Sequence, residues 1–263
     1  VAVLDGGFNL SHPDLVGHIS PYAYDAIDGD WDPEDLGNGF DDDGDGWVDG
    51  GVGHGTFVSS MVLLAAPDAT IQPIRIRDDE GWGFNFEMER GLMMAWKAGA
   101  DVVNISGYSA FDPAGEIVGL INQMRRAGIA VIVSAGNDGM PGLGELALSP
   151  DTLAVGSTDT DDVLAWFSNY DVSATPSMLM APGVNLYGAY GTPEDDSSAY
   201  WSGTSFSCGL VSGAAALAVE RNPGIAPLDL YGLLGDATDP VFDDDGVVLP
   251  GTGRINLLGV VSE

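Results

Sequence analysis

Short apolar runs alternate along the chain with longer stretches of mixed polarity. The runs predict buried β-strands at 1–4, 71–76, 102–105, 129–133 and 153–155. The longer stretches predict α-helices at 57–64, 86–98, 115–127 and 205–220. Because the runs are apolar at successive positions, they indicate strands covered on both faces, as in parallel sheets.

We therefore expect an α/β fold: a doubly wound, mostly parallel β-sheet with helices on both faces, in three layers. Right-handed crossovers would complete such an open sheet. No internal repeat and no Pro- or Ser-rich linker divides the chain, so we interpret residues 1–263 as one domain. The chain begins inside an apolar run, which is typical of a mature domain from which a signal peptide, a propeptide or a first segment has been removed.

The charge is strongly unbalanced, with 40 Asp and Glu against 8 Lys and Arg, and the formal net charge is −32. Such a surface repels nucleic acids and anionic membranes, because phosphate binding needs clustered Lys and Arg. No stretch reaches the roughly 20 apolar residues of a membrane span. We expect neither a nucleic-acid partner nor membrane insertion. Two explanations of the acidity stay open: metal ions neutralise part of it, or high salt screens it.

Four polar residues stand where a predicted strand ends or a predicted helix begins. Asp5 follows the first strand, and Asn137 lies in a polar turn after the strand at 129–133. His54 stands between two glycines ahead of one helix, and Ser205 opens another that is rich in small residues. In open α/β sheets, sites lie beyond the carboxyl ends of the strands. Each residue also has a plain structural interpretation as a turn residue or a helix cap.

In their order along the chain, Asp, then His, then Ser, these segments resemble the subtilisin-like serine proteases of peptidase family S8. Further matching segments lie at 11–15, 104–106, 153–157, 180–183 and 251–256, so the resemblance covers nearly the whole chain. It implies a secreted serine endopeptidase of subtilisin-like fold that acts on polypeptides. It also implies a monomer and an upstream propeptide that serves as inhibitor or chaperone.

The resemblance assigns a role to each of the four residues. Ser205 would be the nucleophile that forms an acyl-enzyme, with His54 as its general base. Asp5 would orient the imidazole of His54. The side-chain amide of Asn137, together with the Ser205 backbone N–H, would hold the oxyanion.

Neighbouring residues are weaker candidates for the same chemistry. Ser202 and Ser207 share the turn of the proposed nucleophile, His12 lies in a turn that looks structural, and His18 looks like a surface residue. The single cysteine, Cys208, excludes an internal disulfide and is interpreted as a small packing residue.

By the same resemblance, the substrate is held as an added β-strand. The expected cleft residues are Ser106, Gly107 and Tyr108 on one edge, Ser134, Ala135 and Gly136 in the wall of the pocket before the scissile bond, and Gly81, Trp82 and Gly83 on the opposite edge. Tyr108 stands where the family usually has glycine, and a phenol there would narrow the pocket.

A Gly- and Asp-rich segment at 25–53 is far longer than ordinary connections. Within it, carboxylates stand at positions 1, 3, 5 and 9 of a loop, with glycine at position 6. This spacing suits oxygen coordination of a structural Ca²⁺ ion, although Val52 at position 12 excludes a true EF-hand. The expected ligands are Asp41, Asp43, Asp45, the backbone carbonyl of Trp47, and Asp49. The plain alternative is a solvated acidic loop, whose carboxylates would repel one another without a cation.

Two other functions stay open at this point. A peptide ligase would use the same acyl-enzyme, and an added amine nucleophile would reveal it in the products. A catalytically silent homologue would act as a calcium-dependent binding module, and it would not react with a serine-directed probe.

Overall fold

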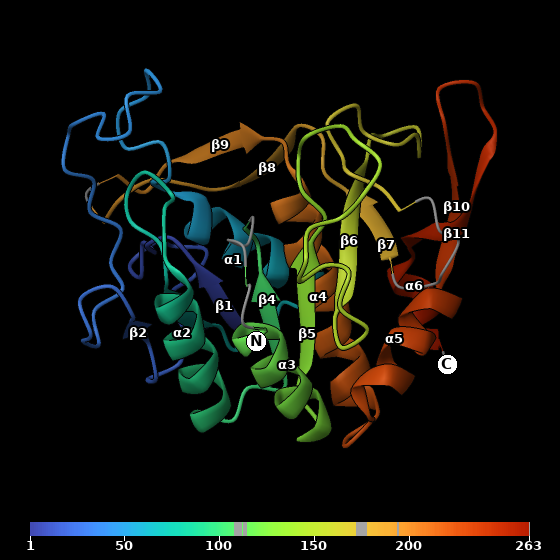
Figure 1. Ribbon diagram of the computed structural model, residues 1–263, viewed down its shortest axis with the longest axis horizontal. Coiled ribbons are helices and arrows are strands. Elements are labelled where there is room, and N and C mark those ends of the chain that lie inside the picture. The colour runs from blue at the N-terminus through green and yellow to red at the C-terminus, as the bar shows by residue number, and fades with distance from the viewer. Residues whose placement is uncertain (108–111, 113–114, 172–177, 194, 263) are drawn as a thin grey trace.

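A mostly parallel β-sheet forms the middle layer of the computed structural model, which describes residues 1–107, 112, 115–171, 178–193 and 195–262 (Figure 1). Across the sheet, the strands are β10 (Thr238–Phe242), β11 (Val248–Ile255), β7 (Met178–Pro182), β6 (Leu153–Thr158), β5 (Ala130–Ser134), β4 (Val102–Ile105), β1 (Ala2–Asp5), β3 (Gln72–Arg75) and β2 (Tyr24–Asp25). Neighbours are parallel except β10 and β11, an antiparallel pair at one edge. A separate antiparallel ribbon pairs β8 (Leu186–Ala189) with β9 (Ser198–Trp201).

Helices cover both faces of the sheet (Figure 1). One face carries α2 (Asn85–Lys97) and α3 (Glu116–Arg126). The other carries α1 (His54–Ala65), α4 (Thr204–Arg221), α5 (Pro227–Asp236) and α6 (Leu257–Ser262). Within the described residues, no helix has both the length and the apolar character that crossing a membrane requires.

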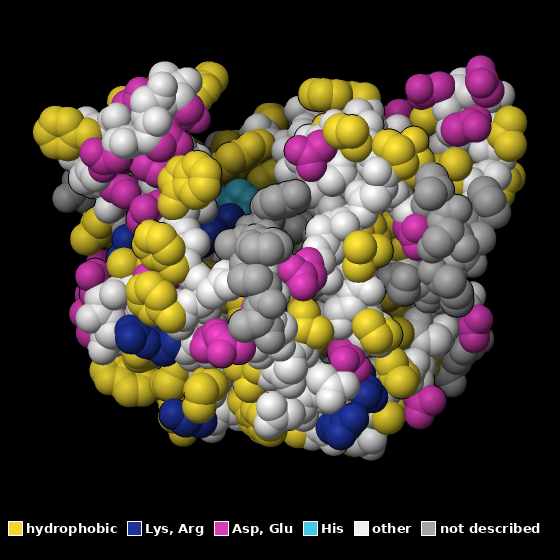
Figure 2. Space-filling view, viewed as in Figure 1, with side chains coloured by type: hydrophobic (Ala, Val, Ile, Leu, Met, Phe, Trp, Pro, Cys, Tyr) yellow, Lys and Arg dark blue, Asp and Glu magenta, His cyan; other side chains and the backbone are white. Residues whose placement is uncertain are grey.

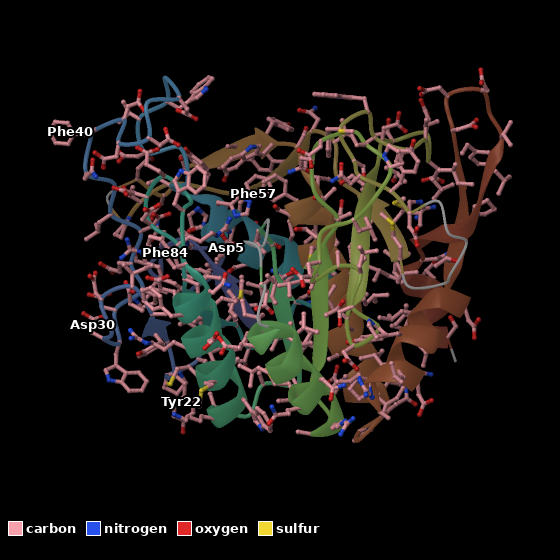
Figure 3. The ribbon with its side chains drawn as sticks, in the orientation of Figure 1. Asp5, Tyr22, Asp30, Phe40, Phe57 and Phe84 are labelled. Carbon is pink, nitrogen blue, oxygen red and sulfur yellow. The ribbon has the colours of Figure 1, made fainter. Side chains whose placement is uncertain are left out.

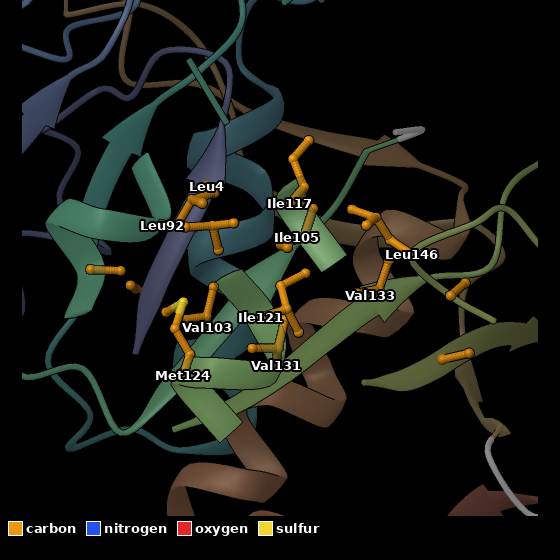
Figure 4. Packing of buried hydrophobic residues seen from close by; sticks show 14 of the residues in the cluster. Leu4, Leu92, Val103, Ile105, Ile117, Ile121, Met124, Val131, Val133 and Leu146 are labelled. Atoms are coloured by element: carbon orange, nitrogen blue, oxygen red, sulfur yellow. The ribbon is translucent and has the colours of Figure 1, made fainter. Parts of the chain in front are cut away.

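The apolar runs of the sequence are explained by the period of the strands. Successive side chains of a strand point to opposite faces, so a strand between two helical layers is apolar at every position. In β5, Val131 and Val133 pack in one core with Ile121 of α3 (Figure 4). Ala130 and Ile132 pack in the other core, with α4.

The expected fold class is confirmed, and the observed elements differ from the expected ones mainly at their ends. The helix expected at 57–64 begins at His54, and the strand expected at 153–155 continues to Thr158. No sequence pattern predicted β2, β7 to β11, α5 or α6. Proline and glycine interrupt β10 and β11, and such residues are tolerated at a sheet edge.

Candidate active site

Asp5 and His54 form a close pair at the carboxyl end of β1. Asp5 is the last residue of that strand and is fully buried. Figure 3 labels it near the centre of the view. His54 is the first residue of α1, and its Nδ1 lies 2.6 Å from Asp5 Oδ1. The imidazole is held from the other side by aromatic rings, since its centroid lies 5.6 Å from Trp201 and 5.4 Å from Phe206. The carboxylate and the rings together fix its orientation.

Ser205 is the second residue of α4 and lies at the same edge of the sheet, next to Phe206, which packs on the imidazole. Its Oγ donates a long hydrogen bond of 3.4 Å to the Ser106 carbonyl, and Ser106 Oγ donates to the Ser205 carbonyl over 2.8 Å. Both serines are buried. Among the described contacts, no hydrogen bond joins Ser205 Oγ to His54, as is common in sites without substrate.

The amide of Asn137 is oriented by the residue that precedes Ser205. The backbone N–H and the hydroxyl of Thr204 both donate to Asn137 Oδ1, each over 2.9 Å. The Thr204 hydroxyl in turn accepts the N–H of Gly136 at 3.2 Å. Because the amide oxygen is held in this way, the Nδ2 group of Asn137 is directed away from Thr204 and remains available as a donor.

Arg77 contacts Asp5 and also the Ser106 carbonyl, to which Ser205 Oγ donates. No sequence pattern predicted a role for this arginine. Its Nη2 lies 2.5 Å from Asp5 Oδ1 and donates to the Ser106 carbonyl over 3.0 Å. Burial alone would raise the pKa of Asp5, but the Arg77 guanidinium, followed by His54 and the Gly6 N–H, holds that pKa below its usual range. Asp5 is therefore ionised at neutral pH.

Asp35 is a second buried carboxyl group beside this site. Its Oδ2 accepts the backbone N–H of Gly53 over 2.5 Å, which fixes the turn that leads into His54. Gly53 has a φ of 82°, in the left-handed region that favours glycine. Burial raises the pKa of Asp35 to about 6, although the Gly53 hydrogen bond acts in the opposite direction.

The two expected edges of the substrate cleft enclose a cavity. Its volume is about 370 Å³, and Gly81, Trp82 and Gly83 line one side, while Gly107 and Arg77 line the other. Figure 2 shows a hollow on this side of the molecule, between a lobe rich in Asp and Glu and the rest of the surface. Tyr108 lies outside the described residues.

The residues of the expected pocket wall begin at the end of β5, and a second hollow lies beside Trp201. Ser134 and Ala135 are buried, and Gly136 is half-buried with a left-handed φ of 104°. The second hollow, of about 590 Å³, is lined in part by Glu80, which also lines the first cavity, and by Trp201, the aromatic neighbour of His54.

Comparison with known proteins identifies the family. The model of the subtilase family, Peptidase_S8, matches residues 1–249. The chain belongs to the subtilase family. It is a subtilisin-like serine peptidase by that membership.

This subtilase is similar to characterised and solved members along most of its length. It is 34% identical to the thermophilic serine proteinase of Bacillus sp. strain AK1 over 232 residues, which are 84% of this chain and 52% of that protein. It is 29% identical to subtilisin BL of Lederbergia lenta over 97% of this chain and 88% of that protein. A protease structure from Pseudoalteromonas arctica PAMC 21717 aligns with a TM-score of 0.82 at 25% identity, covering 99% of this chain and 88% of that one. The chain thus spans about half the length of the first of these relatives.

The rival serines and histidines of the subtilase are engaged elsewhere. Ser207 is fully buried, and its Oγ lies within hydrogen-bond distance of the carbonyls of Ala181 and Pro182, the last two residues of β7. Ser202 Oγ accepts the backbone N–H of Asn185 over 2.8 Å. His12 is buried with Nε2 2.9 Å from the Ser197 carbonyl, which agrees with its structural interpretation. None of these contacts reaches the Asp5–His54 pair.

The acidic loop of the subtilase brings together three of the five expected calcium ligands. Carboxylate oxygens of Asp41, Asp43 and Asp45 lie within 4.8 Å of one another, and all three side chains are exposed. The two oxygens of Asp49 instead accept backbone N–H groups of Asn38 and Gly39, so that carboxylate is directed away from the cluster. Three convergent carboxylates are a donor set that fits an oxygen-preferring cation such as Ca²⁺.

Proposed function

We propose that this subtilase is an endopeptidase that hydrolyses peptide bonds through an acyl-enzyme on Ser205. The observation that carries the proposal is the 2.6 Å contact between Asp5 and His54 at the sheet edge where α4 presents Ser205. An aspartate that accepts from Nδ1 leaves Nε2 as the base, which is the arrangement that a serine hydroxyl needs for activation.

Each residue then has a defined task. Ser205 Oγ attacks the scissile carbonyl carbon while His54 Nε2 accepts the hydroxyl proton, and the negative Asp5 stabilises the imidazolium that forms. Asn137 Nδ2 and the Ser205 N–H donate to the oxyanion. The imidazolium then protonates the leaving amine, and a water molecule releases the acyl group by the same steps in reverse. The 3.4 Å contact of Ser205 with Ser106 is weak enough to break when the substrate enters.

The substrate lies, in this proposal, as an added strand between two edges of the cleft. Gly107 supplies one edge and Gly81 to Gly83 the other, and both line the same cavity. Backbone hydrogen bonds would give affinity, and side-chain selectivity would come from the cavity wall. Polypeptides are the substrate class that the family implies.

The test is covalent labelling with a fluorophosphonate probe, read by intact mass, on the full chain with calcium present. The parent should gain one adduct, and Ser205→Ala should gain none. Ser202→Ala is the matched control from the same turn and should label like the parent. A folded parent that does not react would reject the proposal and favour a silent homologue that only binds.

We further propose that Ca²⁺ is held by Asp41, Asp43 and Asp45 as a structural ion. The support is the convergence of three carboxylates that would otherwise repel one another. When bound, the ion would supply charge neutralisation that holds the loop. An extracellular place of action, where calcium is plentiful, agrees with this proposal.

A further inference from the structure

One carboxylate oxygen receives three donors in this site. Asp5 Oδ1 lies 2.6 Å from His54 Nδ1, 2.5 Å from Arg77 Nη2 and 2.7 Å from the Gly6 nitrogen. Two of these donors are the imidazole that must accept a proton and a guanidinium that never gives one up. Arg77 and His54 therefore compete for the same negative charge.

The guanidinium is built into the site. Its side chain is 18% exposed, and its Nε is buried without a partner among the described atoms. Nη2 also donates to the Ser106 carbonyl, the group that Ser205 Oγ contacts. A Cβ at Gly107 would stand 2.8 Å from Nη1, so only glycine leaves room for the guanidinium here. These contacts fix a positive charge beside the Asp5–His54 pair.

A fixed positive charge at this place has a definite effect. Protonation of the imidazole is favoured by a negative Asp5, but a neighbouring guanidinium neutralises much of that charge and repels the imidazolium. The guanidinium therefore removes part of the stabilisation that Asp5 alone would give to the imidazolium. This electrostatic effect does not change between acid and neutral pH, because a guanidinium stays protonated.

We propose that Arg77 is a positioning residue that shares the Asp5 carboxylate with His54 and so extends the activity of this protease to lower pH. The inference rests on the proposed roles of Ser205 and His54. It concerns the pH range of the nucleophile and is independent of which peptide is cleaved.

Other charged groups face the same region and must be separated from the effect of Arg77. Asp35 holds the turn before His54 and changes its charge near pH 6. Asp43 and Glu80 line the cavity that Arg77 also lines. The comparison is therefore made both in the parent and in an Asp35→Asn background, where the nearest competing titration is absent.

The experiment measures the second-order rate of fluorophosphonate labelling of Ser205 from pH 4.5 to 9. The probe reports the nucleophile directly and does not need the extended cleft. The acid limb of the profile is the fall in labelling rate at low pH. Arg77→Gln keeps a donor but removes the charge, and should move the acid limb to higher pH by about one pH unit. Arg77→Lys keeps the charge and should leave the limb near its parental position. Arg126→Gln, at the exposed C-terminal end of α3, is the matched control for net charge and should also leave the limb in place.

A second variant covers the case in which Arg77→Gln does not fold. Gly107→Ala would displace the guanidinium through its Cβ and should shift the limb in the same direction by a smaller amount. A folded Arg77→Gln that labels with an unmoved acid limb would overturn the inference, whatever the plateau rate, because a merely structural role lowers the plateau alone. A parent that labels at no pH would instead reject the proposed function itself.

Discussion

The indole of Trp82 donates a hydrogen bond to Asp43 Oδ2 over 3.0 Å, and so joins the acidic loop to one edge of the substrate cleft. This hydrogen bond, with a second one from the Asp45 N–H, holds the pKa of Asp43 below its usual range. Further contacts link the same two segments, since Glu80 accepts the backbone N–H groups of Asp42 and Gly50. A cation on the loop would therefore affect both the stability of the fold and the shape of the cleft.

Removal of calcium should lower the melting temperature, because the carboxylates of Asp41, Asp43 and Asp45 then repel one another. The measurement is thermal unfolding with calcium and with chelator. Asp43→Ala should blunt the difference between the two curves. Asp244→Ala, on an exposed turn far along the chain, is the matched control and should keep the full difference. Identical curves for the parent in calcium and in chelator would reject the structural ion.

Loss of the Trp82–Asp43 hydrogen bond should weaken substrate binding more than chemistry. Trp82→Phe keeps an aromatic ring in the cleft but removes its N–H, so one of the contacts that join this edge to the loop is lost. We expect KM for an extended peptide to rise several-fold while kcat changes little, as measured by steady-state kinetics with peptides of increasing length. An equal fall in kcat and in kcat/KM would place Trp82 in the chemical step instead.

Removal of the proposed oxyanion donor should be costly. Asn137→Leu should lower kcat by about 10²–10³, the loss known for removal of such a donor in subtilisin itself, with KM nearly unchanged. Thr204→Val removes one of the two hydrogen bonds that orient the amide and should cost less. A loss below about tenfold for Asn137→Leu would show that another group holds the oxyanion.

Asp35 should make the fold less stable as the pH rises from about 4 to about 6. Its pKa is about 6 in the folded chain against 3.8 for the free group, so across this window the folded state keeps a proton that the unfolded state has lost. Stability is then present below pH 4 and lost as the pH rises through 6, by roughly 3 kcal/mol at most.

Urea unfolding of the parent and of Asp35→Asn at several pH values tests this effect. The substituted chain lacks the titrating group. The free energy of unfolding of Asp35→Asn minus that of the parent should therefore increase between pH 4 and pH 7. Two curves that stay parallel across this range would contradict the burial effect on Asp35.

Cys208 should be inert in the folded protein. It is fully buried within α4, and burial raises the pKa of its thiol to about 12, so the reactive thiolate is scarce at neutral pH. A thiol reagent such as Ellman's reagent should react fully only after unfolding in denaturant. Rapid reaction of the native chain would show an opening of the core around α4.

The positions of the candidate catalytic residues could be predicted because they depend on where strands end and helices begin along the sequence. A buried run ends at Asp5, and small residues open the helix that carries Ser205, so parallel strands and helix starts bring these groups to one edge. The spacing of the acidic loop likewise indicated a cation site, and three of its five expected ligands converge. Asp49 failed to join them because its carboxylate satisfies backbone N–H groups of the loop itself.

The layers of the fold, the family and the order of the candidate residues follow from the amino-acid sequence alone. Hydrophobic period and motif order are carried by near neighbours, which the chain displays directly. Three contacts are visible only in the folded chain: Arg77 shares the carboxylate of Asp5, Asp35 is buried beside His54, and Trp82 contacts Asp43. The members of each pair come from separate segments of the chain, and their contact depends on the register of β1 beside β3 and on how the long loop packs. No local pattern encodes that packing, because the desolvation and charge that it creates exist only in the folded chain.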